Sequence, residues 1–275
     1  DKDYCAAKAA EVYGHEYAMH FPFHSWPAGR DKKQSPNHQT IINNGGQMGA
    51  YNGWERANWF AKDGDDTSEN STQTWNREGP WFSRVREECL AVNRNVGVLD
   101  LPGFSRFKVE GPGASEFLLS KISGNLPAID RMNLAYFPDE RGRVLTEMSI
   151  MRHDLNKFTL ITAGAAQWHD YEILKLGINK NQNVEVSDIT NNWTCLIVTG
   201  PNSRSLINSI SNADLTLPWL SLQNAKIENK QILLARVSYA GELGWEIHAK
   251  NEDMSLIYEK VLSEGATPFG MFALD

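Results

Sequence analysis

Two acidic side chains, Glu242 and Glu246, lie close together in a glycine-rich stretch of the chain, residues 236–247. An ionised carboxylate only accepts hydrogen bonds, and its two oxygens can take two neighbouring N–H donors in a bidentate fork. The stretch could therefore bind a planar group that carries paired donors. In an arbitrary glycine-rich turn, however, such acids are more often simply solvated.

Two predicted strands, 231–239 and 245–249, must hold these acids in place. Between them, Gly241 and Gly244 can both take positive φ, so the sequence predicts a β-hairpin. Strict alternation places both acids on one side, but a bulge at either glycine would shift the register. The pattern alone leaves open which carboxylate points inward.

The spacing Tyr-x-Gly-Glu-x-Gly-aromatic-Glu runs from Tyr239 to Glu246. It resembles the pterin-binding hairpin of the aminomethyltransferase family, the glycine-cleavage T-protein fold that binds tetrahydrofolate. In that family the tyrosine and the second glutamate hold the pterin. The resemblance therefore implies that Tyr239 and Glu246 bind the cofactor tetrahydrofolate. A pterin edge presents the paired N–H donors that suit a carboxylate.

A second motif of that family covers residues 139–150. It resembles the Asn-(x)-Arg-Gly-Gly-Ile-x-x-Asp-(x)-Thr-Val stretch, whose aspartate lies beside the reactive folate nitrogens. Glu147 takes the place of that aspartate, which keeps the charge and lengthens the side chain by a methylene group. By the resemblance, Glu147 is a cofactor-binding residue and the catalytic residue that accepts a proton from the folate amine. Without the motif, a glutamate on an alternating strand would be assigned to the solvent.

The chain also contains an internal duplication. Residues 107–123 and 196–211 each predict a strand, a Gly-Pro break and a helix, and the two breaks are 200 − 111 = 89 residues apart. A predicted hairpin follows each unit. We therefore expect an α+β fold built from two similar αβ halves, the aminomethyltransferase folate-binding fold. Corresponding hairpins would bring Glu147 and the 239–246 stretch toward a shared cleft between the halves.

The N-terminal segment resembles a linker between domains. Most of residues 4–60 is similar to the segment that joins the flavin and folate domains in sarcosine and dimethylglycine dehydrogenases. The matching pieces, in order, are Glu11-Val-Tyr-Gly14, His20-Phe-Pro22, Ala28-Gly-Arg30, Ser35-Pro36 and Gly53-Trp-Glu-Arg-x-Asn-Trp-Phe60. Ala57 stands where that family usually has proline. The resemblance predicts an inter-domain linker at residues 1–75 and a folate-binding domain at residues 76–275.

The same dehydrogenases carry an N-terminal flavin domain with a Gly-x-Gly-x-x-Gly fingerprint, which this sequence lacks. We expect FAD to belong to a missing N-terminal domain or to a partner subunit. The chain is expected to be a portion of a longer enzyme or a separate folate subunit. Residues 269–275 resemble the start of a family segment whose arginine completes the folate site, so the domain is expected to be incomplete at its C-terminus.

The resemblance implies a tetrahydrofolate-dependent one-carbon transfer module. An N-methyl amine, sarcosine or dimethylglycine, would be oxidised in the flavin domain. The iminium or formaldehyde unit would then be captured as 5,10-methylenetetrahydrofolate. Two alternatives stay open: a flavin-independent, folate-dependent aminomethyltransferase or demethylase, and a regulatory relative that has lost catalysis.

The composition argues against two other classes of protein, those that bind nucleic acid and those that span a membrane. The hydrophobic share of 41% and the charged share of 22% are those of a globular protein. The net charge of −7, without a basic cluster, argues against a nucleic-acid partner. No apolar run reaches the roughly 18 residues of a membrane span, so no membrane partner is expected.

Neither the cysteines nor the histidines predict a metal site. Their positions are Cys5, Cys89 and Cys195, and His15, His20, His24, His38, His153, His169 and His248. The three cysteines lack metal-ligand spacing and indicate buried thiols in a reducing compartment, the cytoplasm or the mitochondrial matrix. Cys195 is expected in a strand core. The first four histidines fall in a proline-broken segment that does not suit zinc, and the last three are expected to stand alone.

Overall fold

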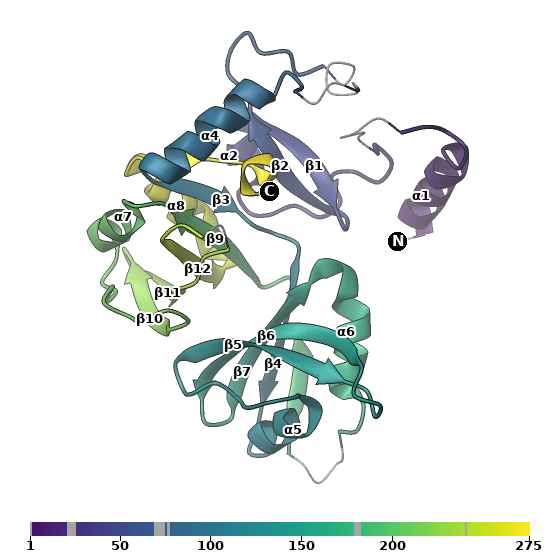
Figure 1. Ribbon diagram of the computed structural model, residues 1–275, viewed down its shortest axis with the longest axis vertical. Coiled ribbons are helices and arrows are strands. Elements are labelled where there is room, and N and C mark those ends of the chain that lie inside the picture. The colour runs from purple at the N-terminus through teal and green to yellow at the C-terminus, as the bar shows by residue number, and fades with distance from the viewer. Residues whose placement is uncertain (1, 21–25, 69–74, 76–77, 179–182, 240) are drawn as a thin grey trace.

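The computed structural model describes residues 2–20, 26–68, 75, 78–178, 183–239 and 241–275. Two large antiparallel sheets dominate it (Figure 1). The six-stranded sheet has the order β10 (Leu222–Ile227), β11 (Lys230–Ala235), β12 (Gly244–Lys250), β9 (Trp193–Thr199), β3 (Gly97–Asp100) and β13 (Thr267–Pro268). The five-stranded sheet has the order β5 (Arg131–Pro138), β6 (Val144–Asp154), β7 (Lys157–Ala163), β4 (Phe104–Glu110) and β8 (Glu185–Asp188). Only the short pairing of β13 with β3 is parallel among the described strands.

Helices cover these sheets, and a small hairpin precedes them. The helices are α1 (Lys2–Gly14), α2 (His38–Asn43), α4 (Phe82–Arg94), α5 (Ala114–Lys121), α6 (Gln167–Lys175), α7 (Ser203–Ile210), α8 (Asn251–Ser263) and α9 (Met271–Leu274). The hairpin is β1 (Gly46–Tyr51) with β2 (Trp54–Phe60). In the part of the chain that the structure describes, no helix is both long and apolar enough to cross a membrane. The N-terminal helix α1 ends at Gly14.

The duplicated strand–break–helix units are confirmed as β4–α5 and β9–α7. Their break glycines share one backbone conformation, with φ of 119° at Gly111 and 121° at Gly200. A Cβ on Gly111 would lie 2.2 Å from the carbonyl oxygen of Asn183, and one on Gly200 would lie 2.5 Å from that of Asn95. Both positions therefore require glycine for conformation and for space.

Each sheet buries one face under its own helices. In the six-stranded sheet, Trp245 and Ile247 pack with Ile257 of α8 in one continuous core. In the five-stranded sheet, Met148 and Ile150 pack with Phe117 of α5 in another. Burying a large apolar side chain fully contributes roughly 1.5–3 kcal/mol, so these two cores hold each half together.

The uncovered faces of the two sheets meet each other. Met132 of β5 and Met151 of β6 pack against Leu222, Leu233 and Ala235 of the six-stranded sheet. The edges also join, because the backbone N–H of Met132 donates to Leu220 and that of Leu222 donates to Asp130. The two sheets therefore face each other and are joined by these contacts, and we refer to the region between their facing sides as the inter-sheet space.

The predicted strand 231–239 is too long. β11 ends at Ala235 and β12 begins at Gly244, so the hairpin is present with a longer connection than predicted. The backbone N–H of Arg236 donates to Ser221, and its carbonyl accepts from Leu220. Arg236 thus pairs with the segment before β10 instead of continuing along β12.

The N-terminal hairpin packs onto the following domain through its aromatic residues. Trp59 of β2 lies with Trp81 and Val85 in a buried cluster, and Phe272 of α9 packs against it. Arg30 holds the preceding loop by donating through Nε and Nη2 to the buried carboxylate of Glu55. The hairpin is therefore a packed element as well as a connection.

The expectation of three buried thiols is wrong for two of the cysteines. Cys195 is buried in β9 as predicted, whereas Cys5 and Cys89 are exposed. Cys5 lies on α1, none of whose described residues is buried, and Cys89 lies on α4, where Val85 and Glu88 are the buried positions.

Asp100, at the end of β3, should make the unfolding free energy depend on pH. It is buried and accepts hydrogen bonds from Ser35 Oγ (2.5 Å) and Asn37 Nδ2 (2.8 Å). Burial raises the pKa of Asp100 from 3.8 to about 6, so the folded state binds its proton more tightly than the unfolded state does. This contribution to the unfolding free energy is present below pH 3.8 and is lost as the pH rises to about 6.

We therefore expect Asp100→Asn to remove this loss. Relative to the unmodified chain, the variant should gain on the order of 3 kcal/mol of unfolding free energy between pH 3.5 and pH 7. Denaturant unfolding at the two pH values measures the change. Asp139→Asn is the control. Hydrogen bonds from Arg143 lower the pKa of Asp139, so this variant should lose unfolding free energy relative to the unmodified chain as the pH rises, instead of gaining it. A difference between Asp100→Asn and the unmodified chain that stays constant with pH would contradict the expectation.

Candidate functional site

Glu246 points into the space between the two sheets. Its neighbours Trp245 and Ile247 are fully buried in the core beneath the helices, so alternation turns Glu246 to the opposite face of β12. Ala235, its cross-strand partner, lies among the inter-sheet contacts. The question of which acid points inward is thereby answered. Glu242 lies in the connection between β11 and β12 and accepts a hydrogen bond from Asn93 Nδ2 (3.0 Å).

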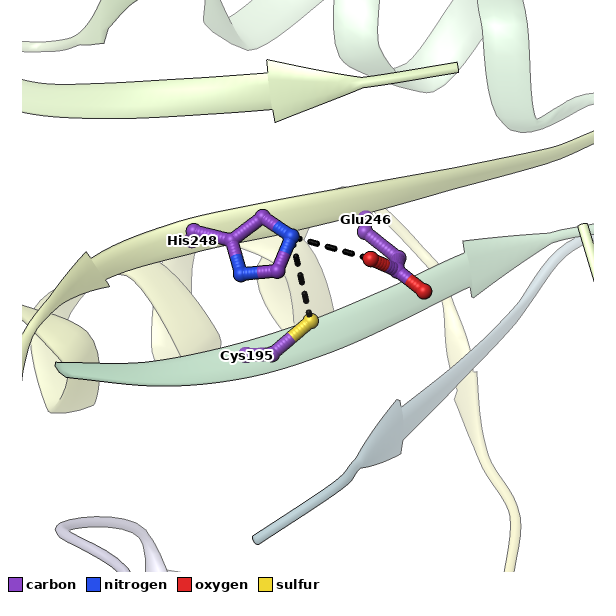
Figure 2. Close-up of side chains that lie close together, drawn as sticks. All are labelled: Cys195, Glu246 and His248. Carbon is purple, nitrogen blue, oxygen red and sulfur yellow. Dashed lines mark hydrogen bonds and ion pairs between the residues drawn. The ribbon is translucent and has the colours of Figure 1, made fainter. Parts of the chain in front are cut away.

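Glu246 forms a cluster with His248 and Cys195, shown in Figure 2. Nε2 of His248 lies 2.9 Å from Oε2 of Glu246 and 4.0 Å from Sγ of Cys195. His248 is only 4% exposed and Cys195 only 3%. The expectation that His248 stands alone is wrong, because antiparallel register pairs it directly with Cys195 across β12 and β9.

A buried arginine faces the same cluster from the other sheet. Arg106 of β4 is 4% exposed, and its Nη1 donates to the carbonyl oxygens of Phe104 (3.2 Å) and Trp193 (3.3 Å). Its Nε has no hydrogen-bond partner among the described residues. Burial lowers the pKa of Arg106, while Cys195 and Glu246 act to raise it. The guanidinium thus supplies positive charge next to the Glu246 carboxylate.

The thiol of Cys195 is held in its neutral form. Burial raises the pKa of Cys195 well above its usual value, and the carboxylate of Glu246 raises it further. Arg106 opposes this shift without reversing it. A neutral, buried thiol is a poor nucleophile, so the proximity of Cys195 to His248 does not make it a catalytic cysteine.

Glu147 lies on the same inter-sheet space from the side of β6. Met148 and Ile150 point to the helices, so Glu147 shares the opposite face with Met151, which touches the six-stranded sheet. Arg106, Ile161 and Ser149 form a cross-strand row on this face, and Ser149 lies two residues along β6 from Glu147. The fold therefore turns Glu147 and Glu246 toward a common region. No hydrogen bond or ion pair joins the two acids within the described ranges.

The surroundings of Glu147 are open and apolar. Glu147 is exposed, and its cross-strand partner on β5 is Tyr136. Tyr136 and Leu134 are about half exposed on the same face, beyond the point where the two sheets touch. A carboxylate beside apolar and aromatic surface suits a planar heterocycle with polar edges.

Tyr239 lies apart from both acids. It lies between β11 and β12 with 82% of its surface exposed and makes no hydrogen bond to the other described residues. This connection is anchored just before β12, since the carbonyl oxygen of Leu243 accepts hydrogen bonds from Gly200 N, Thr199 Oγ1 and Ser203 Oγ. Glu246 and Glu147 therefore lie on sheet faces that are turned toward each other, while Tyr239 lies in an exposed segment before β12.

Sequence reasoning missed three residues of this site: Arg106, Cys195 and His248. Arg106 shares the strand 104–109 with a second charged residue, Lys108, so its charge alone did not mark it as buried. The pairing of Cys195 with His248 depends on register between strands 53 residues apart, which spacing along the chain does not reveal.

Family comparison agrees with this fold. Residues 37–275 match the GCVT N-terminal domain, and residues 1–35 match the FAD dependent oxidoreductase central domain. The boundary at residue 75 between linker and folate-binding domain stays a prediction.

Similar proteins include both enzymes named in the sequence resemblance. Mitochondrial dimethylglycine dehydrogenase of Rattus norvegicus is 30% identical over 280 residues, which cover 99% of this chain and 32% of that protein. The aminomethyltransferase of Staphylococcus epidermidis is 27% identical over 249 residues, which cover 89% of this chain and 62% of that protein. The chain thus spans about a third of the dehydrogenase it matches.

A solved structure shares the fold. The glycine cleavage system aminomethyltransferase T of Bartonella henselae superimposes with a TM-score of 0.70 at 21% identity, covering 88% of this chain and 61% of that one. This confirms the predicted aminomethyltransferase fold. The chain belongs to the GCVT N-terminal domain family, as an aminomethyltransferase-like domain related to dimethylglycine dehydrogenase.

Proposed function

We propose that this chain binds tetrahydrofolate between its two sheets and uses it to accept a one-carbon unit. The observation that carries the proposal is the placement of Glu246. Its carboxylate ends the Tyr-x-Gly-Glu-x-Gly-aromatic-Glu motif and turns into the inter-sheet space, toward which Glu147 of the second motif also points.

The Glu246 carboxylate is suited to paired N–H donors. Oε2 lies at hydrogen-bond distance from His248, while Oε1 has no partner among the described residues. Its side chain is 23% exposed, so a ligand can reach it from the inter-sheet space. An ionised carboxylate is the form that accepts two donors.

Glu147 would accept and hold the proton that the reacting amine loses. Tetrahydrofolate supplies, when bound, the amine nitrogen that takes up the one-carbon unit. A carboxylate in apolar surroundings also stabilises a nearby cationic one-carbon donor once water is excluded. Tyr136 and Leu134 provide such surroundings next to Glu147. Tyr239, in the exposed segment before β12, would contact the pterin.

The source of the one-carbon unit is inferred from the relatives. Dimethylglycine dehydrogenase and the formaldehyde-forming 4-methylaminobutanoate oxidase of Paenarthrobacter nicotinovorans, 29% identical, both take their names from N-methyl amines. We infer that an N-methyl amine is oxidised in a flavin domain or subunit that partners this chain. The match of residues 1–35 to a flavin oxidoreductase domain supports that partner. The mitochondrial dimethylglycine dehydrogenases support a location in the mitochondrial matrix.

A second candidate is a flavin-independent aminomethyltransferase, supported by the match to the Staphylococcus epidermidis enzyme. Both candidates require folate binding, which isothermal titration calorimetry of the chain with tetrahydrofolate tests directly. Saturable binding of one molecule per chain is expected. Absence of binding heat, together with an unchanged melting temperature at saturating tetrahydrofolate, would contradict both candidates and favour a regulatory relative.

A further inference from the structure

We propose that Cys195, Glu246 and His248 form a binding site for a divalent transition-metal ion of the zinc type. The three side chains offer a sulfur, an oxygen and a nitrogen ligand, and these ligand atoms all lie within 4.8 Å of one another. Thiolate, imidazole and carboxylate are the three ligand types that zinc takes in proteins. Occupation of this site would withdraw Glu246 from its proposed contact with folate.

The spacing of the ligand atoms is close to that of a tetrahedral site. With zinc–ligand bonds of about 2.0–2.3 Å, neighbouring ligand atoms are about 3.3–3.6 Å apart. The observed separations from His248 Nε2 are 2.9 Å to Glu246 Oε2 and 4.0 Å to Cys195 Sγ. One is slightly short and the other slightly long, so movements of about half an ångström would seat an ion among the three atoms.

Rigid strands present these ligands. Cys195 and His248 are directly opposite on β9 and β12, and Glu246 precedes His248 by two positions on the same face of β12. Both strands are central in the six-stranded sheet, with neighbours on each side. Because Glu246 is partly exposed and the other two are buried, the fourth position would open toward the inter-sheet space.

The types of the three ligand atoms restrict which ions can bind. As the metal–sulfur bond forms, Cys195 gives its proton to solvent, and the proton on His248 Nε2 moves to Nδ1 so that Nε2 can coordinate. The divalent ion, the thiolate and the carboxylate then sum to zero charge beside the buried guanidinium. Thiolate and imidazole ligands suit zinc-type ions, whereas Mg²⁺ and Ca²⁺ prefer oxygen ligands, so Zn²⁺ and Co²⁺ should bind while Mg²⁺ and Ca²⁺ should not.

The test uses the chain with its two exposed cysteines replaced, Cys5→Ser and Cys89→Ser, so that Cys195 is the remaining thiol. Co²⁺ is titrated in the absence of folate, and the near-ultraviolet absorption from thiolate-to-cobalt charge transfer is recorded. We expect a band that saturates at one equivalent, is abolished by Zn²⁺ and is insensitive to Mg²⁺. Absence of the band at saturating Co²⁺ would overturn the proposal.

Further variants in this background assign the ligands. Cys195→Ser should abolish the band, and His248→Gln and Glu246→Gln should each weaken Co²⁺ binding by roughly tenfold or more. His169→Gln is the matched control, because His169 is exposed and lies in the other half of the molecule. Circular dichroism confirms that each variant is folded. Equal affinity in the His248 variant, the Glu246 variant and the control would show that cobalt binds elsewhere.

The competition with folate rests on the proposed function and is measured separately. One equivalent of Zn²⁺ should reduce tetrahydrofolate affinity in the unmodified chain and leave it unchanged in the Cys195→Ser variant. If Zn²⁺ leaves the tetrahydrofolate affinity of the unmodified chain unchanged, the two ligands do not compete. If the chain binds Co²⁺ but no folate at all, the proposed function fails and the metal site stands.

Discussion

Replacing Glu246 by alanine is expected to abolish tetrahydrofolate binding. The carboxylate is the charged acceptor that the inter-sheet space presents from β12, and a ligand's paired N–H donors would be buried without partners after its removal. Truncating one partner of such a charged, hydrogen-bonded pair weakens the binding free energy by about 2–5 kcal/mol. This corresponds to a dissociation constant that is raised by about thirtyfold to several thousandfold. Isothermal titration calorimetry measures this change.

Glu242→Ala is the matched control for this prediction. Glu242 lies in the same motif and carries the same charge, but it is bonded to Asn93 outside the inter-sheet space. Its removal should leave the dissociation constant unchanged. Because Glu246→Ala also leaves Arg106 without a neighbouring carboxylate, melting temperatures of all variants are compared, and Glu246→Gln serves as the milder change. Equal affinity in the unmodified chain and in Glu246→Ala would refute the assigned role.

Replacing Glu147 by glutamine should separate binding from transfer. Glutamine keeps the size and polarity of the side chain but cannot take up a proton. We therefore expect tetrahydrofolate affinity within about twofold of the unmodified chain, together with one-carbon transfer slowed by about 10²–10⁴-fold. Single-turnover formation of 5,10-methylenetetrahydrofolate, measured with the flavin domain or subunit proposed above, gives the rate.

Two further variants make the Glu147 experiment specific. Glu140→Gln changes an exposed acid in the turn before β6 and should leave the rate unchanged. Glu147→Asp keeps the charge and shortens the side chain to the residue usual in the family motif, so it should retain most of the transfer rate. A rate in Glu147→Gln equal to that of the unmodified chain would exclude proton transfer by this residue.

The duplicated architecture could be predicted from the sequence because its signals are local. A strand, a Gly-Pro break and an amphipathic helix follow one another within about 17 residues at 107–123 and again at 196–211. Gly111 and Gly200 both adopt the positive φ that such a break requires. The inward direction of Glu246 was not predictable, because it depends on the register of β12 against β9 and β11.

The end of β11 and the partners of Glu246 depend on contacts between distant segments. Residues 236–239 continue a strand pattern, yet Arg236 pairs with residues 220 and 221 and the strand stops at Ala235. Arg106 approaches Glu246 from the opposite sheet, and Cys195 from a neighbouring strand. Alternation and spacing describe one strand at a time, so they cannot reveal side chains that meet across the space between sheets.

The joined edges of β5 and the segment before β10 have a consequence for how the duplicated chain can be divided. A cut between Asp188 and Trp193 would separate the repeats in sequence, but each piece would lose both backbone hydrogen bonds between the edges and the apolar cover of its inner face. Each piece would then expose an unpaired strand edge beside Met151 or Leu233, a combination that promotes aggregation. The repeats are thus obligate halves of one folding unit, and neither is expected to be recovered from expression as a monodisperse protein.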